Sequence, residues 1–442
     1  MSNSASGPAA LTGAQASFPQ LVIEGGQIPA RFFATRRTHN GFTPAAIVTV
    51  QGYIHAVDQE FSQNVFPETA SAGARLDARD CVVLPGFIDL HIHGAAGHDT
   101  MDATPEALLH MARFLVQQGV TGFLPTTMTA PHAATLAALQ TVARFVNQPA
   151  VNHSPVQLTT LPAHGARVLG VHLEGPYLSP DFPGAQPAAA IRAPDLAEFT
   201  AYLDAAPIRL VTLAPELPGA DALIHAAQAR GIRVALGHSA ATYEQARAAF
   251  AQGMDQVTHT YNAMTGLHHR APGSVGAALV DDRVYAQLIA DGIHVHPAAM
   301  SILARAKGPD KVVLITDAMA ATGMGPGRYA LGGLPVVVEN DECRLESGAL
   351  AGSILTMDAA LRNFMAATAL PLETAWISTS YAPACALGLD AHLGAIEPGF
   401  AADLVLLDAE LRVVATIIGG EVAYLRDPAR LRHSPPHSSP RG

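Results

Sequence analysis

Apolar runs alternate with helix-like segments through the middle of the chain. Eight runs with the composition of strands each lead into a segment with helical features, and they are continuously apolar rather than alternating. Continuous runs are typical of strands covered on both faces, as in a parallel sheet. They span residues 82–93, 120–126, 167–174, 208–214, 232–239, 256–260, 285–291 and 311–318. Eight such units favour a (β/α)8 TIM-like barrel, with an open doubly wound sheet as the alternative.

Local signals support helices between these runs. Thr104-Pro105 predicts an N-cap followed by proline at the first helical position, and Gly119 and Gly231 lie where helices should end. The alternation of strand and helix therefore does not rest on hydrophobicity alone.

The two ends of the chain have a different pattern. Residues 20–84 and 394–428 contain short β segments broken by Gly, Pro and Asn. We therefore expect a small β-sandwich domain built from both termini beside a barrel of residues 85–393. The extreme ends, 1–19 and 429–442, are poor in large apolar residues, and we expect mobile tails there.

Composition narrows the class of protein. The chain has 442 residues, 49% apolar, with 26 Lys+Arg against 37 Asp+Glu and a net charge of −11. This balance argues against a general nucleic-acid or anionic-membrane binder, which needs a clustered basic face. Three scattered cysteines, Cys81, Cys343 and Cys385, encode neither a disulfide framework nor a thiolate zinc site. With no secretory start and no run of about 18 apolar residues, we expect a soluble cytoplasmic protein.

Metal-ligand residues gather at the ends of the predicted strands. In a barrel the active site lies at the carboxyl ends of the strands. The residues found there are His91, His93, Glu174, His238, His259 and Asp317. His91 and His93 point to the same side of their strand because side chains alternate, so the two imidazoles can hold one cation.

Taken singly, each of these residues has a structural explanation. An isolated HxH pair, or a lone His238 or His259, is more often a hydrogen-bonded core histidine. Together, the four His and two carboxylates at the mouths of five strands predict one or two divalent metals, with zinc, iron and manganese as candidates. Such metals lower the pKa of bound water to about 7 and polarise a carbonyl, which indicates a hydrolase. Asp317 could bind metal or move the proton.

Longer motifs around these residues resemble a known family. The segments are PGFIDLHIHG (85–94), HLEGPYLSP (172–180), GHSAAT (237–242), THTYNAMTGLHHRAPG (258–273), ADGIHVHP (290–297), ITDAMAATGM (315–324), AGSILTMDAALRN (351–363) and GAIEPGFAADLVLLD (394–408). In this order they resemble the N-acetylglucosamine-6-phosphate deacetylases of the amidohydrolase superfamily. The resemblance runs from about residue 20 to 425.

The resemblance implies roles for individual residues. Glu174, His238 and His259 match the family's principal metal site, and Asp317 matches its catalytic acid/base. The presence of His91 and His93 makes a binuclear centre bridged by Glu174 plausible, with zinc or iron as the metal.

Further matches concern the substrate. Asn262, Ala263 and His294 match substrate contacts, and Arg270 matches a basic residue that reaches the phosphate from the neighbouring subunit of a homodimer. Arginine suits a phosphate because its planar fork donates two hydrogen bonds. The alternatives are a solvated loop charge for Arg270 and a rim histidine for His294.

One position departs from the family pattern. Gln186 stands where the family usually has a His that polarises the amide carbonyl. A glutamine amide can donate a hydrogen bond but carries no positive charge. We predict that Gln186 donates to the substrate carbonyl; the alternative is a loop residue that points to solvent.

These observations lead to one functional prediction and two rivals. We expect metal-dependent hydrolysis of N-acetylglucosamine 6-phosphate to glucosamine 6-phosphate and acetate. One rival substrate is N-acetylgalactosamine 6-phosphate or another N-acyl compound. A rival of another class is a non-catalytic barrel scaffold.

Overall fold

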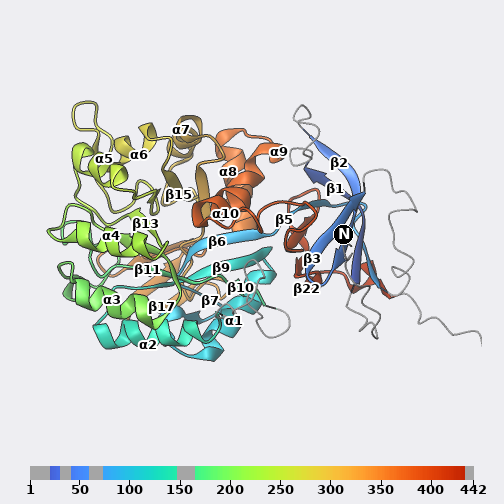
Figure 1. The fold of residues 1–442 in the computed structure, drawn as a ribbon, viewed down its shortest axis with the longest axis horizontal. Helices are drawn as coiled ribbons and strands as arrows, with labels where there is room; N and C mark the ends of the chain where they lie inside the picture. Colours follow the sequence, from blue (N-terminus) through green and yellow to red (C-terminus); the bar gives the residue numbers. More distant parts are fainter. Residues whose placement is uncertain (1–19, 30–40, 59–72, 147–164, 434–442) are drawn as a thin grey trace, which may run out of the picture.

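The computed structural model describes residues 20–29, 41–58, 73–146 and 165–433. It consists of a barrel surrounded by helices and a β-rich body beside it (Figure 1). The predicted tail 1–19 lies outside the described residues. So do the last nine residues of the predicted C-terminal tail, 434–442.

The predicted barrel is confirmed. Its strands are β6 (Phe87–Ile92), β9 (Val120–Thr127), β11 (Val171–Glu174), β12 (Ile208–Leu213), β13 (Arg233–Leu236), β14 (Gln256–Val257), β15 (Tyr285–Ile289) and β16 (Val312–Ile315). Neighbours pair in parallel in this order, and the short β10 (Arg167–Val168) adds to β9. A parallel bridge between Ile92 and Ala318 brings the last strand back to the first. This closure excludes the open doubly wound sheet.

Helices cover the outside of the barrel. The main ones are α1 (Pro105–Val116), α2 (His132–Ala143), α3 (Leu196–Ala205), α4 (Ala220–Ala229), α5 (Tyr243–Ala251), α6 (Gly273–Val280), α7 (Pro297–Lys307) and α8 (Met357–Thr368). The short α9 (Leu372–Ala375) and α10 (Tyr381–Leu387) follow. The predicted cap is present, because the Thr104 hydroxyl accepts from the Ala107 N–H at 3.3 Å with Pro105 at the first helical position.

The first predicted strand, 82–93, is divided between two sheets. Residues 82–85 form β5 (Val82–Pro85), which pairs with the terminal sheet, and β6 belongs to the barrel. Gly86 stands between them, and a Cβ there would lie 2.2 Å from side-chain atoms of Thr121. Hydrophobicity does not reveal this division because both strands are buried.

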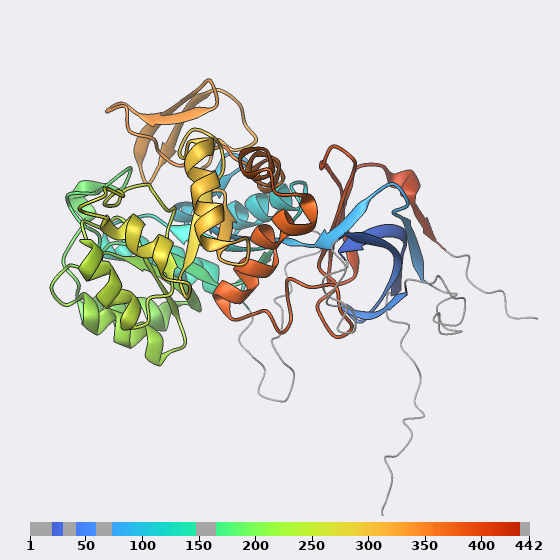
Figure 2. The ribbon, with the colours of Figure 1, turned by 90° about the horizontal axis from the view of Figure 1, so that it is seen from above.

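The termini build a common sheet. It contains β1 (Gln20–Pro29), β2 (Phe42–Val50), β3 (Tyr53–Asp58), β4 (Ala74–Asp77), β5, β20 (Leu404–Leu407), β21 (Val413–Ile418), β22 (Glu421–Leu425) and β23 (Leu431–His433). Its order is β22-β21-β20-β5-β1-β2-β3, and β4 with β23 branches from β1. Figure 2 shows the first and last strands side by side, away from the helices.

This terminal sheet surrounds its own apolar core. The core contains Ile23, Ile47, Leu76, Val83, Leu404 and Ile417, all at most 1% exposed. This sheet agrees with the expected small β domain built from both termini; within the described ranges its strands are connected as one forked sheet. Residues 429–433, which we expected in a mobile tail, instead complete a 3-10 turn, η6 (Pro428–Arg430), and form β23, which pairs with β4. The domain boundaries themselves stay a prediction.

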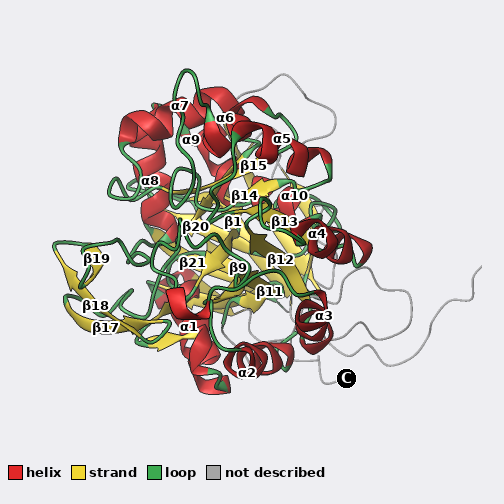
Figure 3. Ribbon diagram, turned by 90° about the vertical axis from the view of Figure 1, so that its left-hand side faces the viewer, coloured by secondary structure: helices red, strands yellow, loops and turns green. Residues whose placement is uncertain are grey.

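A three-stranded antiparallel sheet follows β16 and was not predicted. It consists of β17 (Gly327–Leu331), β18 (Leu334–Glu339) and β19 (Glu342–Leu345), and it projects from the side of the barrel (Figure 3). Its apolar side packs with Met128 and Met319 beside the barrel mouth. The remaining short elements are the two-stranded β7 (Gly94–Ala95) and β8 (His98–Asp99), and the 3-10 turns η3 (Thr100–Asp102), η4 (Ala188–Ala190) and η5 (Trp376–Thr379).

Candidate metal centre and substrate cavity

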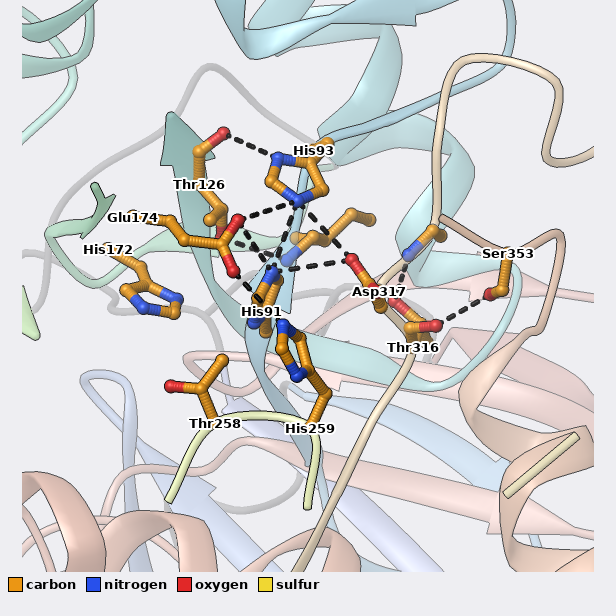
Figure 4. A network of polar contacts seen from close by, with 12 residues as sticks. His91, His93, Thr126, His172, Glu174, Thr258, His259, Thr316, Asp317 and Ser353 are labelled. Atoms are coloured by element: carbon orange, nitrogen blue, oxygen red, sulfur yellow. Dashed lines mark hydrogen bonds and ion pairs between the residues drawn. The ribbon is translucent and has the colours of Figure 1, made fainter. Parts of the chain in front are cut away.

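The structure brings all five predicted metal ligands together at the carboxyl ends of the strands. His91 lies at the end of β6 and His93 directly follows it; Glu174 ends β11; His238 and His259 follow β13 and β14 by two residues. All five are buried, with at most 4% of each residue exposed. Figure 4 shows Glu174 facing His91 and His93, with His259 below His91.

Glu174 divides these ligands into two groups. Its Oε2 lies 3.3 Å from His93 Nε2 and 3.6 Å from His91 Nε2. Its Oε1 lies 3.3 Å from His238 Nε2 and 3.2 Å from His259 Nε2. Within each histidine pair the two Nε2 atoms are 3.1 Å apart. One carboxylate therefore stands between two pairs of imidazoles.

Backbone carbonyls orient two of the imidazoles. His93 Nδ1 lies 3.3 Å from Thr126 O, and His238 Nδ1 lies 3.0 Å from Phe182 O. Since a carbonyl only accepts, each Nδ1 carries a proton, and this contact turns the Nε2 edge of each ring toward Glu174. Among the described residues, the buried Nδ1 atoms of His91 and His259 have no hydrogen-bond partner.

This donor set fits a divalent metal. His91, His93 and Glu174 form one group of donor atoms within 4.8 Å of one another, and Glu174, His238 and His259 form the other. Imidazole nitrogen and carboxylate oxygen are ligands that zinc and iron accept. Facing Nε2 lone pairs at 3.1 Å repel unless a cation or proton lies between them. The arrangement therefore suits a cation at either group.

The charges around Glu174 are mutually dependent. Burial opposes ionisation of Glu174, but the surrounding imidazoles, His91 first, hold the pKa of this carboxyl well below its usual value. Burial likewise opposes a charge on His93. The Asp317 and Glu174 carboxylates outweigh the effect of burial and raise the pKa of His93 well above its usual value. The site thus keeps Glu174 ionised and attracts positive charge to its centre.

Asp317 joins the His91–His93 side of the site. Its Oδ1 lies 3.3 Å from the Nε2 atom of each of these histidines. Asp317 follows β16 and has a left-handed backbone conformation, with φ 49°. His238 and His259 share this uncommon conformation, with φ 47° and 30°. Such strained backbone positions cluster at functional sites, where the surrounding structure holds them.

A cavity of about 200 Å³ opens beside these residues. Four of the residues predicted to act on substrate line it, namely Gln186, Asn262, Ala263 and His294. His294 is held there by Asp291, whose Oδ2 lies 2.6 Å from His294 Nδ1. Arg270 is not among the residues that line this cavity. It lies on an exposed loop, where its Nη1 contacts His269 Nε2 at 2.7 Å.

The loop that carries Gln186 does not point to solvent. Gln186 is 5% exposed, its Nε2 donates to Glu174 Oε2 at 2.7 Å, and its Oε1 accepts from the Thr129 N–H at 2.8 Å. The alternative of a solvated loop residue is therefore excluded. Only one of the two amide N–H groups is used by Glu174.

Sequence reasoning missed part of the cavity wall. Met128, Leu331 and Leu350 line it; Leu331 ends β17, and Leu350 follows β19 of the unpredicted sheet. The turn residues Gly332-Gly333 and Asn340-Asp341 are the sequence signal that predicts these hairpins.

His172 is a second residue whose role the sequence did not indicate. Its ring packs edge-on against His91, with centroids 4.6 Å apart. Its Nδ1–H donates to Leu90 O at 3.1 Å, and the Thr212 hydroxyl lies 2.7 Å from its Nε2. Burial lowers the pKa of His172 well below its usual value, so the ring is neutral and packs against the candidate ligand His91.

Comparison with known proteins places this geometry in context. The amidohydrolase family model matches residues 82–423. An N-acetylgalactosamine-6-phosphate deacetylase from Escherichia coli O157:H7 is 42% identical over 85% of this chain and 97% of its own length. An N-acetylglucosamine-6-phosphate deacetylase from Vibrio furnissii is 41% identical over 77% of this chain and 83% of its own.

Solved structures share the whole fold. A variant of N-acetyl-D-glucosamine-6-phosphate deacetylase from Mycobacterium smegmatis, in complex with N-acetyl-D-glucosamine-6-phosphate, matches with a TM-score of 0.79 and 33% identity over 92% of this chain and all of that one. The N-acetylglucosamine-6-phosphate deacetylase from Thermotoga maritima matches with a TM-score of 0.78 and 33% identity, covering 91% and 99%. Within the described ranges, no helix has the length and apolar character to cross a membrane.

Proposed function

The chain belongs to the amidohydrolase family, and from this premise we propose that it hydrolyses N-acetylglucosamine 6-phosphate to glucosamine 6-phosphate and acetate, in the cytoplasm. The observation that carries the proposal is the position of Glu174 between two histidine pairs, with Asp317 beside one of them and a cavity in front. The relatives named for this reaction support the choice of substrate.

The five ligands would hold one or two divalent metals, with zinc or iron as the candidates. Glu174, His238 and His259 would hold one, and His91, His93 and Glu174 the other. A metal bound there supplies Lewis-acid polarisation of the acetamide carbonyl and makes water more acidic.

Asp317 is the proton carrier in this proposal. Its carboxylate accepts a proton from the water whose oxygen adds to the acetamide carbon. It then returns the proton to the amine nitrogen as the C–N bond breaks, which releases acetate and the free amino sugar. Its low pKa, held down by His91 and His93 against the effect of burial, means that it begins the cycle ionised and able to accept.

Gln186 and the cavity wall orient the substrate. The amide N–H of Gln186 that is not bonded to Glu174 donates to the acetamide oxygen. Asn262, Ala263 and His294 contact the sugar, and all three line the cavity. We further propose a homodimer in which the partner subunit's Arg270 binds the phosphate. The exposed position of Arg270, away from the cavity of its own chain, favours this arrangement.

A second substrate has specific support. The relative from Escherichia coli O157:H7 is named for N-acetylgalactosamine 6-phosphate, an epimer that differs at one hydroxyl. The chemistry is unchanged, so only the groups that contact that hydroxyl decide between the two. The rival of a non-catalytic scaffold is disfavoured because every proposed ligand is present and they converge.

A panel of acetylated sugars tests the proposal. Acetate release by the metal-loaded protein should give its highest kcat/KM with N-acetylglucosamine 6-phosphate. A higher kcat/KM with N-acetylgalactosamine 6-phosphate would assign the second substrate. No acetate from either sugar phosphate would reject deacetylation of this class.

A further inference from the structure

Gln186 connects two strand ends of the barrel through the metal-ligand carboxylate. Its Oε1 is bound to the Thr129 N–H, just beyond β9, and its Nε2 donates to Glu174 Oε2 at the end of β11. The Gln186 N–H in turn donates to Pro183 O at 2.9 Å, which folds the loop into a turn. The amide is therefore fixed at both ends, and its orientation is determined by a backbone donor.

The same loop also supports the second group of ligands. Phe182 O accepts from His238 Nδ1, and Gly184 lies so near that a Cβ there would be 3.0 Å from His238 Cε1. Gly184 has φ 55°, a conformation that favours glycine. Residues 182–186 thus contact the shared carboxylate of Glu174 and one histidine of the second group, His238.

We infer that Gln186 is a positioning residue that fixes the Glu174 carboxylate so that each oxygen faces one histidine pair. The bond falls on Oε2, the oxygen nearest His91 and His93. Without it, Glu174 could rotate and move its Oε2 away from that pair. Gln186 therefore acts first on metal retention at the His91–His93 group. This inference rests on the proposed metal-dependent function.

The uncharged amide suits this position. An imidazolium beside Glu174 would neutralise the carboxylate and compete with a cation for it. A glutamine amide orients the carboxylate and leaves its full negative charge for metal, because the amide does not ionise. This gives a physical reason for Gln186 in a chain that also has both His91 and His93.

Measuring how tightly the protein holds metal distinguishes this positioning role of Gln186 from its proposed contact with the substrate. Full-length protein loaded with Zn²⁺ is compared with Gln186→Ala, Gln186→Asn and Gln186→His, by elemental analysis and by competition with a chelator. Removing a group that orients a metal ligand typically weakens binding about 10–100-fold. We therefore expect the dissociation constant of the more weakly bound Zn²⁺ to rise about 10–100-fold in Gln186→Ala. Gln186→Asn should show the same effect, because its shorter side chain does not reach Glu174. Gln186→His, which keeps a donor, should recover part of the loss.

Met128→Ala is the matched control, because Met128 lines the same cavity and offers only a thioether. It should retain Zn²⁺ like the unaltered protein. Equal Zn²⁺ retention by Gln186→Ala and the unaltered protein would overturn the inference, whatever happens to turnover. Acetate release is measured separately: its absence from the unaltered protein would reject the proposed function without changing the metal comparison.

Discussion

Asp317 and His91 are joined twice, through the backbone and through the side chains. The Asp317 N–H donates to His91 O at 2.9 Å, and Asp317 Oδ1 lies 3.3 Å from His91 Nε2. The first contact closes the barrel between its last and first strands. The second places a carboxylate beside the candidate metal ligands. Barrel closure and assembly of the candidate site therefore depend on the same two residues.

Replacing Asp317 by Asn should remove turnover while the fold remains. The amide keeps the backbone bond to His91 but cannot accept and return a proton. General acid–base catalysis contributes about 10²–10⁴-fold, so kcat should fall by that order. Acetate release gives the rate, and elemental analysis should show nearly unchanged metal content. Near-normal kcat in Asp317→Asn would assign the proton transfer to another group.

Removing metal should abolish activity and adding it back should restore activity. The ligand groups around Glu174 consist only of imidazoles and a carboxylate, which hold divalent metal without help from a thiolate. Dialysis against a chelator followed by titration with Zn²⁺ or Fe²⁺ measures this directly. A fully active preparation that contains no transition metal by elemental analysis would contradict the proposed chemistry.

Mixed dimers test the role of Arg270. Asp317→Asn chains and Arg270→Ala chains should each be impaired alone. When mixed, the site with an intact Asp317 receives Arg270 from the other chain, so part of the activity should return. The control replaces the Asp317→Asn chain by one that carries both substitutions and should give no rescue. Failure of the first mixture despite verified subunit exchange would place Arg270 outside the neighbour's site.

Acid should remove the stabilising effect of Asp281. The Arg283 guanidinium donates two hydrogen bonds to this carboxylate, the Arg283 backbone N–H a third and Arg247 a fourth. Together they lower the pKa of Asp281 to about 2 against the opposing effect of burial. Because the folded pKa lies below the unfolded value, the unfolded chain takes up the proton first as pH falls.

The stabilisation is thus present above pH of about 4 and disappears toward pH 2. Solvent screening of the arginines limits it to about 1 kcal/mol. At pH 6, Asp281→Asn should have a lower midpoint of thermal unfolding than the unaltered protein. At pH 3, the difference between the two midpoints should be smaller. The same difference in midpoint at pH 6 and pH 3 would show that ionisation of Asp281 does not contribute to stability.

The barrel and the convergence of the candidate ligands were predictable because their signals are local. His91, Glu174 and His238 each lie at or just beyond the carboxyl end of an apolar run, and strand alternation fixes which side chains share a face. By contrast, the bond between Gln186 and Glu174 depends on how a loop returns to the barrel mouth. That path is decided by tertiary packing, which periodicity does not describe.

The division at Gly86 and the sheet β17–β19 were missed for related reasons. Both halves of the run 82–93 are buried, so their hydrophobic pattern is continuous although they join different sheets. The hairpins of β17–β19 have turn residues that predict them locally. Their place beside the cavity follows from packing of Leu331 with Met128, a contact between residues far apart in the chain.

The most direct test of the account compares acetate release from N-acetylglucosamine 6-phosphate with release from unphosphorylated N-acetylglucosamine, using the same metal-loaded protein. A metal-dependent sugar-phosphate deacetylase should have a much higher kcat/KM for the phosphorylated sugar, and the chelated protein should release acetate from neither. Equal kcat/KM for the two sugars, or release that survives removal of metal, would contradict the account.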